Sequence, residues 1–297
     1  MLIALLVPLS LAIVAFAAIL LRAVISKRAQ PTPEAIVLGA VTNFFDTLGI
    51  GSFAPTMAWL KFRKLVPDRL IPPTMLVGHS LPTMAQAVIF LMILGVLVDP
   101  VLLVGCMIAL LMGGLLGAPL VARTRVWFVQ LAVAVALLVA GILYAVANLK
   151  LMPGGGIASS LPLWLTVAAI AVNFVFGVLI NFGIGHYAPS LILFSLMGLD
   201  PKLIFPIMAG GGGLMVAGAG VRHIGLGQID LRIVTGIAIG GIPAVLVAAF
   251  IVKNMPVDTL RWLVAGVVLY ASAVMFRSAL IGRREHSAQG ATIPVTS

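Results

Sequence analysis

Of the 297 residues, 62% are hydrophobic and 9% are charged, and the mean hydropathy is +1.23. A soluble domain carries about 25% charged residues, so this composition excludes the soluble classes and favours helices that span a lipid bilayer. The formal net charge of +10 does not indicate nucleic acid, because Lys and Arg stand at the ends of apolar runs, where they set topology and contact lipid headgroups.

The chain begins with an apolar run at 2–25 that has no positive residue before Arg22. A signal peptide would carry its positive charges ahead of the apolar stretch, so we expect a retained helix with its N-terminus outside. Six further runs are long enough to span a bilayer: 70–97, 100–121, 126–147, 202–221, 229–252 and 257–281. The polar tail at 283–297 is expected to be disordered and cytoplasmic.

Two other segments, 34–60 and 161–197, are apolar but interrupted, and they are copies of each other. Residues 49–56 (GIGSFAPT) align with residues 183–190 (GIGHYAPS) at an offset of 134 residues, and the match continues beyond them without gaps. Chance matching of apolar sequence is the alternative, but the aligned prolines that follow argue against it.

The duplication predicts a single membrane domain over 1–297. It contains an extra N-terminal helix within 1–30, a first repeat at 34–147 and a second repeat at 161–282. The loop at 148–160, with its proline and three glycines, is the linker between the repeats.

The interrupted segments either cross the bilayer or enter it and return on the same side. If both cross, the 18 positive residues divide nine to nine; if both return, they divide 14 to four. The positive-inside rule favours return, with the first hairpin entering from the cytoplasm and the second from outside. Full crossing stays open as the alternative.

We therefore expect an all-α, multi-pass protein of the inner cell membrane with a cytoplasmic C-terminus. It has two inverted structural repeats, each a broken or re-entrant helix hairpin plus three transmembrane helices, and one extra N-terminal helix. Inverted repeats whose broken helices meet near the midplane are a recurring architecture of secondary transporters.

The glycines of the two motifs allow positive φ and a tight reversal. Ser52 and His186 then stand at the start of the second half-helices, where free N–H groups and the helix dipole favour an anion. If the two tips converge, they form a site for a small anionic substrate held by backbone N–H groups and hydroxyls. The alternative is that the glycines only permit close packing.

Polar side chains and glycines cluster around both tips. The candidate substrate-binding residues are Asn43, Thr47, Gly49, Gly51, Ser52, Phe53, His79, Ser80, Thr83, Asn181, Gly183, Gly185, His186 and Tyr187. Asp46 is the one carboxylate of eight that falls deep in an apolar segment, and intramembrane acids are costly and usually functional. It could carry a coupling proton, bind Na⁺ or pair with His79; its alternative role is to cap the broken turn.

We find no metal-ligand spacing, nucleotide-binding loop or catalytic motif. The sequence therefore predicts no cofactor, no metal and no enzymatic activity. The expected partners are the anion, a coupling proton or Na⁺, and the lipid bilayer, with no nucleic acid; a homodimer is compatible with the sequence.

At the glycine motifs the sequence resembles the sulfite exporter TauE/SafE (TSUP) family of membrane permeases. The matches are Gly49, Gly51 and Pro55 in the first half and Gly183, Gly185 and Pro189 in the second, within roughly residues 34–282. Ser52 and His186 depart from the family pattern, which often has another glycine there. The resemblance implies export of sulfite or of an organosulfonate such as sulfoacetate, driven by the proton gradient. An uncoupled anion channel and a structural subunit of a membrane complex are the alternatives.

Overall fold

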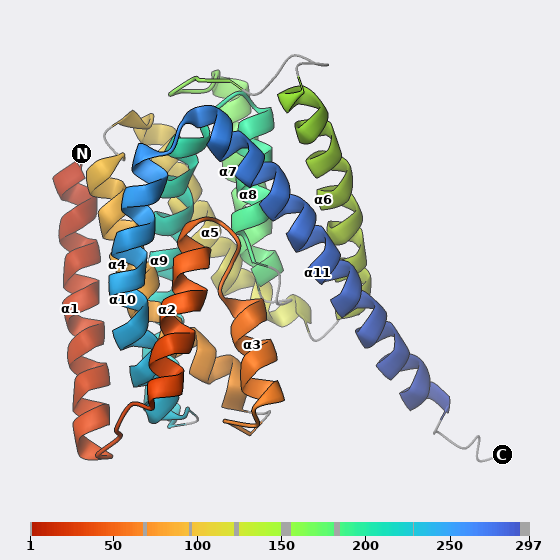
Figure 1. Ribbon diagram of the computed structural model, residues 1–297. Coiled ribbons are helices and arrows are strands. Elements are labelled where there is room, and N and C mark those ends of the chain that lie inside the picture. Colours follow the sequence, from red (N-terminus) through yellow and green to blue (C-terminus); the bar gives the residue numbers. More distant parts are fainter. Residues whose placement is uncertain are drawn as a thin grey trace.

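The computed structural model describes residues 2–67, 70–94, 97–121, 125–149, 156–180, 185–227 and 229–291. Within these ranges the chain is helical apart from its turns, and the prediction of an all-α membrane fold is confirmed (Figure 1). The helices are α1 Leu2–Ser26, α2 Pro33–Thr47, α3 Phe53–Phe62, α4 Ile71–Ile93, α5 Pro100–Val121, α6 Val126–Asn148, α7 Leu163–Ile180, α8 Tyr187–Leu196, α9 Pro201–Leu226, α10 Leu231–Asn254 and α11 Val257–Ala291.

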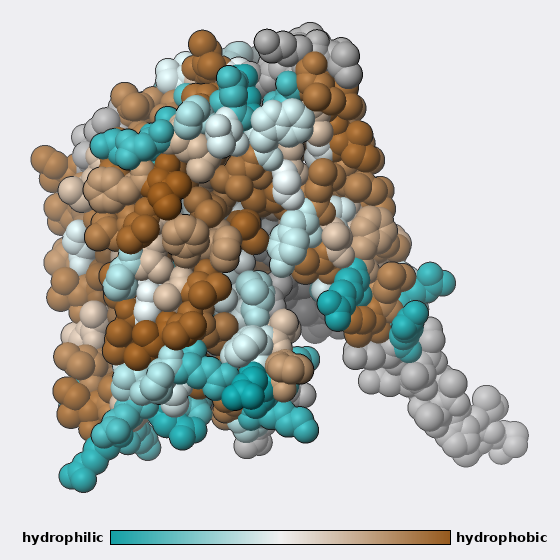
Figure 2. Space-filling view, viewed as in Figure 1, coloured by the Kyte–Doolittle hydropathy of each residue, from teal (hydrophilic) through white to brown (hydrophobic). Residues whose placement is uncertain are grey.

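Seven helices in the described part are long and apolar enough to cross a bilayer: α1, α4, α5, α6, α7, α10 and α11. Six of them match predicted runs, and the seventh, α7, was expected as one arm of a broken segment. The predicted run at 202–221 is not among the seven, because the apolar part of α9, Pro201–Val216, is a shorter helix. Figure 2 shows apolar side chains across the middle of the molecule and hydrophilic ones toward its two ends. This is the surface that a bilayer-embedded protein presents to lipid and water.

The first interrupted segment folds as a hairpin that returns to the end from which it entered. Arg63, just after α3, donates from Nε to Glu34 Oε1 at the start of α2 over 2.8 Å. Trp59 Nε1 donates to the same oxygen over 3.0 Å. A broken helix that crossed the bilayer would separate its two ends by about 30 Å. The Glu34–Arg63 pair therefore marks the mouth of a re-entrant hairpin.

The second interrupted segment is closed in the same way. Ala158, before α7, donates its N–H to Gly198 O over 3.2 Å, and Asp200, after α8, donates to Ala158 O over 2.9 Å. The turn that joins the two helices, at 181–184, lies outside the described residues. Both broken segments are thus re-entrant, which decides against the alternative of full crossing.

The two hairpins open at opposite ends of the molecule (Figure 1). Near the start of α4, Thr74 Oγ1 accepts from Asp230 N over 3.0 Å, at the end that holds the Glu34 mouth. Just beyond the other end of α4, Asp99 N donates to Ser159 O over 3.3 Å, beside the second mouth. The hairpins therefore approach the interior from the two sides, as the charge distribution predicts.

The pairing of helices repeats between the halves. The closest packing is of α2 on α10, α7 on α5, α4 on α9 and α6 on α11. Exchanging the first half, α2 to α6, for the second, α7 to α11, returns the same four pairs. Inverted repeats are a prediction from the sequence, and this exchange of partners supports it.

Glycines make these pairings close. A Cβ at Gly240 of α10 would lie 1.9 Å from Ile36 O of α2, and one at Gly113 of α5 would lie 2.0 Å from Phe174 O of α7. Small residues at such crossings let membrane helices approach backbone to backbone, where dispersion contacts replace the hydrophobic effect.

Two contacts of α8 break the symmetry between the halves. Helix α8 is covered by α6 and α11, whereas the main neighbours of α3 are α2 and α4. Four large side chains of α3 are accordingly exposed: Phe53, Met57, Trp59 and Phe62. The first hairpin is thus open along a flank that the second hairpin keeps closed.

The C-terminal segment differs from expectation. We expected a disordered tail from residue 283, but α11 continues as a helix to Ala291. Figure 1 shows this helix extending away from the bundle toward the end that holds the first mouth. Residues 292–297 lie outside the described part.

Candidate functional site

The tip of the first hairpin lies against the second hairpin in the interior. Gly49 has φ of 98° and Gly51 has φ of 88°, the left-handed region that glycine adopts without strain. A Cβ at Gly49 would lie 2.6 Å from Leu191 Cδ1 of α8. The chain neighbours of Gly49 pack on the same buried cluster as Tyr187 and Leu191. The two broken segments therefore converge, as the sequence-based site requires.

Asp46 caps the start of α3. Its side chain is buried, with the residue 6% exposed, and Oδ1 accepts a hydrogen bond from Ser52 N over 2.7 Å. A carboxylate at this position satisfies one of the unpaired N–H groups of a helix start and interacts favourably with the helix dipole. The capping role that the sequence left as the alternative is the geometry observed.

His79 of α4 joins the two arms of the first hairpin. Its Nδ1 lies 2.9 Å from Asn43 Oδ1 of α2, and its Nε2 lies 3.0 Å from Thr56 Oγ1 of α3. Asn43 Nδ2 donates to Gly39 O over 2.7 Å, so Oδ1 faces the ring as an acceptor and Nδ1 carries the ring proton. With both ring nitrogens engaged, the pair with His79, one of the roles that the sequence allowed for Asp46, is not formed.

The Thr56 hydroxyl has two acceptors and one proton. It lies 2.7 Å from Ser52 O as well as 3.0 Å from His79 Nε2. With a neutral ring it can donate to only one of them. A second proton on the ring would let Nε2 donate to Thr56 while Thr56 donates to Ser52. A neutral ring therefore leaves one of these two acceptors without the Thr56 proton.

The second tip is built differently from the first. Helix α8 starts at Tyr187 after the N-cap residue His186. The residue aligned with Asp46 is Ile180, so this half has no equivalent carboxylate. His186 instead approaches Met208 O of α9 with Nε2 at 3.1 Å. A Cβ at Gly212 would lie 3.2 Å from the His186 ring, so this glycine leaves room for it.

Three buried side chains around the start of α8 lack a hydrogen-bond partner within the described part of the chain: Gln86 of α4, and Tyr187 and Ser190 of α8. The Tyr187 hydroxyl lies close to the Gln86 side chain, but without the distance and angle of a hydrogen bond, and within electrostatic range of Asp46. The large majority of buried polar side-chain atoms in proteins have a partner. An unsatisfied group of this kind indicates a place where water or a ligand binds.

The remaining candidate substrate-binding residues lie at different distances from the two tips. Thr47 is buried and donates to Asn43 O of its own helix, and the Phe53 ring centroid lies 5.6 Å from that of His79. Thr83 lies beside His186 at Gly212. Ser80 donates to Leu76 O and faces α9, so it lies away from the tips.

The second glycine of each motif has open space beside it. A Cβ built at Gly51 or at Gly185 would have no neighbouring atom within 4 Å. Asn181 and Gly183, two further candidates, lie outside the described residues. Among the residues that are described, no group of three or more His, Cys, Asp or Glu side chains is arranged to hold a metal ion.

Two residues of the second tip were missing from the sequence-based list. Gln86 stands on the same face of α4 as His79 and Thr83, at the helical spacing of seven and three residues. Ser190 aligns with Thr56 in the duplication. Helical periodicity thus places Gln86 on this face already from the sequence, and the alignment of the halves carried the signal that could have placed Ser190 at the site.

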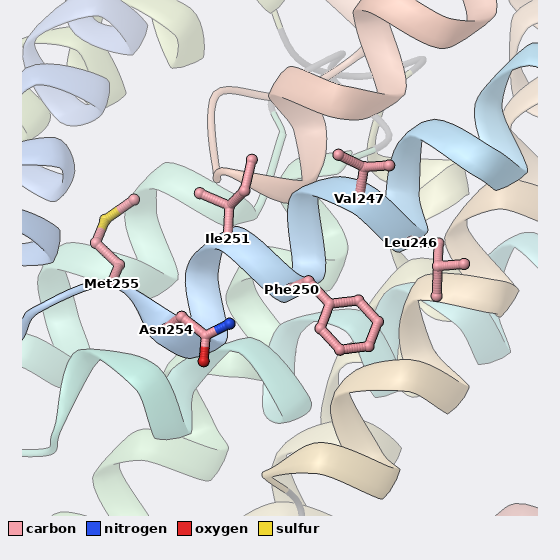
Figure 3. A pocket seen from close by; sticks show the side chains of 6 residues that line it. All are labelled: Leu246, Val247, Phe250, Ile251, Asn254 and Met255. Atoms are coloured by element: carbon pink, nitrogen blue, oxygen red, sulfur yellow. The ribbon is translucent and has the colours of Figure 1, made fainter.

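A separate hollow of about 660 Å³ lies on α10 (Figure 3). It is lined by Leu246, Val247, Phe250, Ile251, Asn254 and Met255. All but Asn254 and Met255 are exposed, large apolar side chains, of the kind that lipid covers in a membrane. It shares no residue with the polar cluster at the tips, and we assign it no part in the site.

The fold and the tips together define a class: a multi-pass, all-α membrane protein with two re-entrant hairpins that meet in a buried polar interior. No family model, curated protein or solved structure matches the chain. The resemblance to the TauE/SafE family accordingly rests on the two glycine motifs.

Proposed function

We propose that this protein is a secondary transporter for a small anion, which binds near the middle of the bilayer where the two hairpin tips meet. The observation that carries the proposal is the contact of the first tip with α8, through Gly49 and Leu191, beside buried polar side chains without partners. Broken backbone at membrane depth is tolerated only inside protein or beside a wet cavity. Paired broken helices at the midplane are typical of transporter binding sites.

The asymmetry between the hairpins supports a carrier. Helix α8 is covered by α6 and α11, and α3 has no equivalent cover among its main contacts. A carrier with inverted repeats exposes its site to one side at a time by changing how one repeat packs on the other. The difference between α3 and α8 is what one such state would show.

We further propose that the anion is sulfite or an organosulfonate such as sulfoacetate, that it is exported, and that a proton drives it. The substrate, direction and driving force rest on the resemblance to the TauE/SafE family. Asp46 is the proposed coupling group. Because its carboxylate caps α3 beside the meeting point of the tips, taking up a proton would remove a negative charge that opposes the substrate.

Flux into proteoliposomes tests the proposal. Purified protein of verified fold is reconstituted, and uptake of sulfite, sulfoacetate, taurine and sulfate is measured against concentration and against an imposed pH gradient. We expect saturable, pH-driven flux of sulfite or sulfoacetate. Asp46→Asn should weaken the pH dependence, whereas Asp258→Asn, a matched change at a side chain that is 93% exposed, should not. Absence of saturable flux for all four anions would contradict the proposal.

A further inference from the structure

We infer that the transported anion binds at the second hairpin tip, on the start of α8, and that Asp46 closes the first tip to it. This inference rests on the proposed anion transport and states which of the two aligned tips holds the substrate. The duplication alone would make the tips equivalent; the contacts around them do not.

The start of α3 already holds an anionic group. Asp46 Oδ1 accepts the Ser52 N–H over 2.7 Å, and both residues are buried. An anion that came to this helix start would meet a donor in use and a carboxylate of the same sign. The hydroxyl of Thr56 and the ring of His79 are likewise engaged with each other. The first tip is therefore satisfied without a ligand.

The start of α8 is the reverse case. No carboxylate stands at the aligned position, which is Ile180, and the N-cap side chain gives no cap at either helix. A helix start leaves its first N–H groups without intrahelical partners, and these groups and the helix dipole favour an anion.

Unpaired side chains add an independent indication. Gln86 and Ser190 are 0% exposed and Tyr187 is 7% exposed, and the polar side-chain atoms of all three lack partners within the described residues. Tyr187 is the first residue of α8 and Ser190 lies one turn further on. The His186 ring packs edge-on against the Tyr187 ring at 4.7 Å between centroids, which restrains the orientation of the phenol.

The donors define the class of ligand. The Gln86 amide, the Tyr187 hydroxyl and the Ser190 hydroxyl are three neutral side-chain donors beside the backbone N–H groups of the helix start. A small oxyanion that carries three oxygens on one centre, as sulfite and sulfonates do, can accept from all of them. Because none of the three donors is charged, the ligand can leave again without breaking an ion pair.

Binding of inorganic sulfite to purified protein in detergent, by calorimetry and by ligand-induced thermal shift, tests the inference. We expect Tyr187→Phe, Ser190→Ala and Gln86→Leu each to weaken binding about ten-fold, the effect of losing one hydrogen bond to a charged ligand. Ile180→Asp, which gives the second tip the carboxylate of the first, should abolish binding. Thr56→Ala makes the change of Ser190→Ala at the aligned position of the first tip and should alter the dissociation constant less than two-fold.

If Gln86, Tyr187 and Ser190 served only the fold, their variants would be less stable than the wild type in the absence of sulfite. Since the three side chains have no partner to lose, their variants should melt without sulfite at or above the temperature of the wild type. If one of them does not fold, the others and Ile180→Asp carry the test. Equal losses at both tips, or a larger loss for Thr56→Ala than for Ser190→Ala, would overturn the inference while leaving anion binding intact. No binding of any transported anion by the wild type would instead count against the proposed function.

Discussion

Replacing Asp46 by asparagine and by alanine measures what holds the first hairpin tip together. Asparagine keeps an oxygen that can accept the Ser52 N–H, which is now bonded over 2.7 Å; alanine leaves that donor unpaired. A buried donor without a partner costs about 1–3 kcal/mol. The alanine variant should therefore be less stable than the asparagine variant by that amount, because the charge is removed in both and its desolvation cancels in the comparison.

Thermal unfolding in one detergent, followed by intrinsic fluorescence, provides the measurement. For a domain of this size 1 kcal/mol corresponds to about 2–4 °C, so the two variants should differ by several degrees. Asp258, whose side chain is 93% exposed, supplies the matched pair of substitutions, and there the alanine and asparagine variants should agree within about 0.5 kcal/mol. If the Asp46 pair differs no more than the Asp258 pair, the carboxylate does not cap α3.

Three further predictions concern the fold. Gly240→Ala should destabilise the protein by about 1–3 kcal/mol, since its Cβ would lie 1.9 Å from a carbonyl of α2. The control Gly266→Ala, whose Cβ would have no atom within 4 Å, should leave the melting temperature unchanged or raise it. Equal effects of the two substitutions would contradict the α2–α10 packing. The hydrogen bond from Arg63 lowers the pKa of Glu34, so the pair is intact at neutral pH and is lost as the pH falls through that lowered value. Arg63→Met should bring the Glu34 titration, followed by carbon NMR, back up toward its ordinary value, and an unchanged midpoint would refute the contact. An impermeant thiol reagent applied to intact cells should label Lys253→Cys and spare Arg63→Cys, because the two positions lie at opposite ends of the molecule. The one native cysteine is buried and should give no background. Labelling of both positions from outside would contradict the topology.

Much of the fold could be predicted from the sequence because, in a membrane protein, short stretches of sequence determine each helix and its direction. A run of apolar residues long enough to span lipid defines each helix, and the charges at helix ends define its direction. The mouth formed by Glu34 and Arg63 had been indicated only by counting positive residues on each side. The end of α11 was missed because its last turns are polar, and hydropathy does not distinguish a polar helix from a polar coil.

The details of the site depended on information that the sequence does not express. Ser80 follows His79 in the chain, but one residue turns a side chain about 100° around a helix, so Ser80 faces Val216 of α9 while His79 faces the first hairpin. Asp46 was recognised from the sequence as the one deep carboxylate. That its side chain points toward Ser52 N depends on the conformation of the turn between α2 and α3, which the sequence did not reveal. Duplicated motifs suggested equivalent tips, and only the contacts separate a capped one from an open one.

Exchange across the membrane of proteoliposomes tests the central claim, anion transport through these hairpins, most directly. Vesicles loaded with unlabelled sulfite are diluted into a trace of labelled sulfite, and the label is followed inside over time. A carrier is expected to accumulate the label transiently, faster with sulfite inside than without it, and Tyr187→Phe should reduce the effect. Accumulation that is independent of internal sulfite and does not saturate would identify a channel, and no uptake by folded protein would contradict sulfite transport altogether.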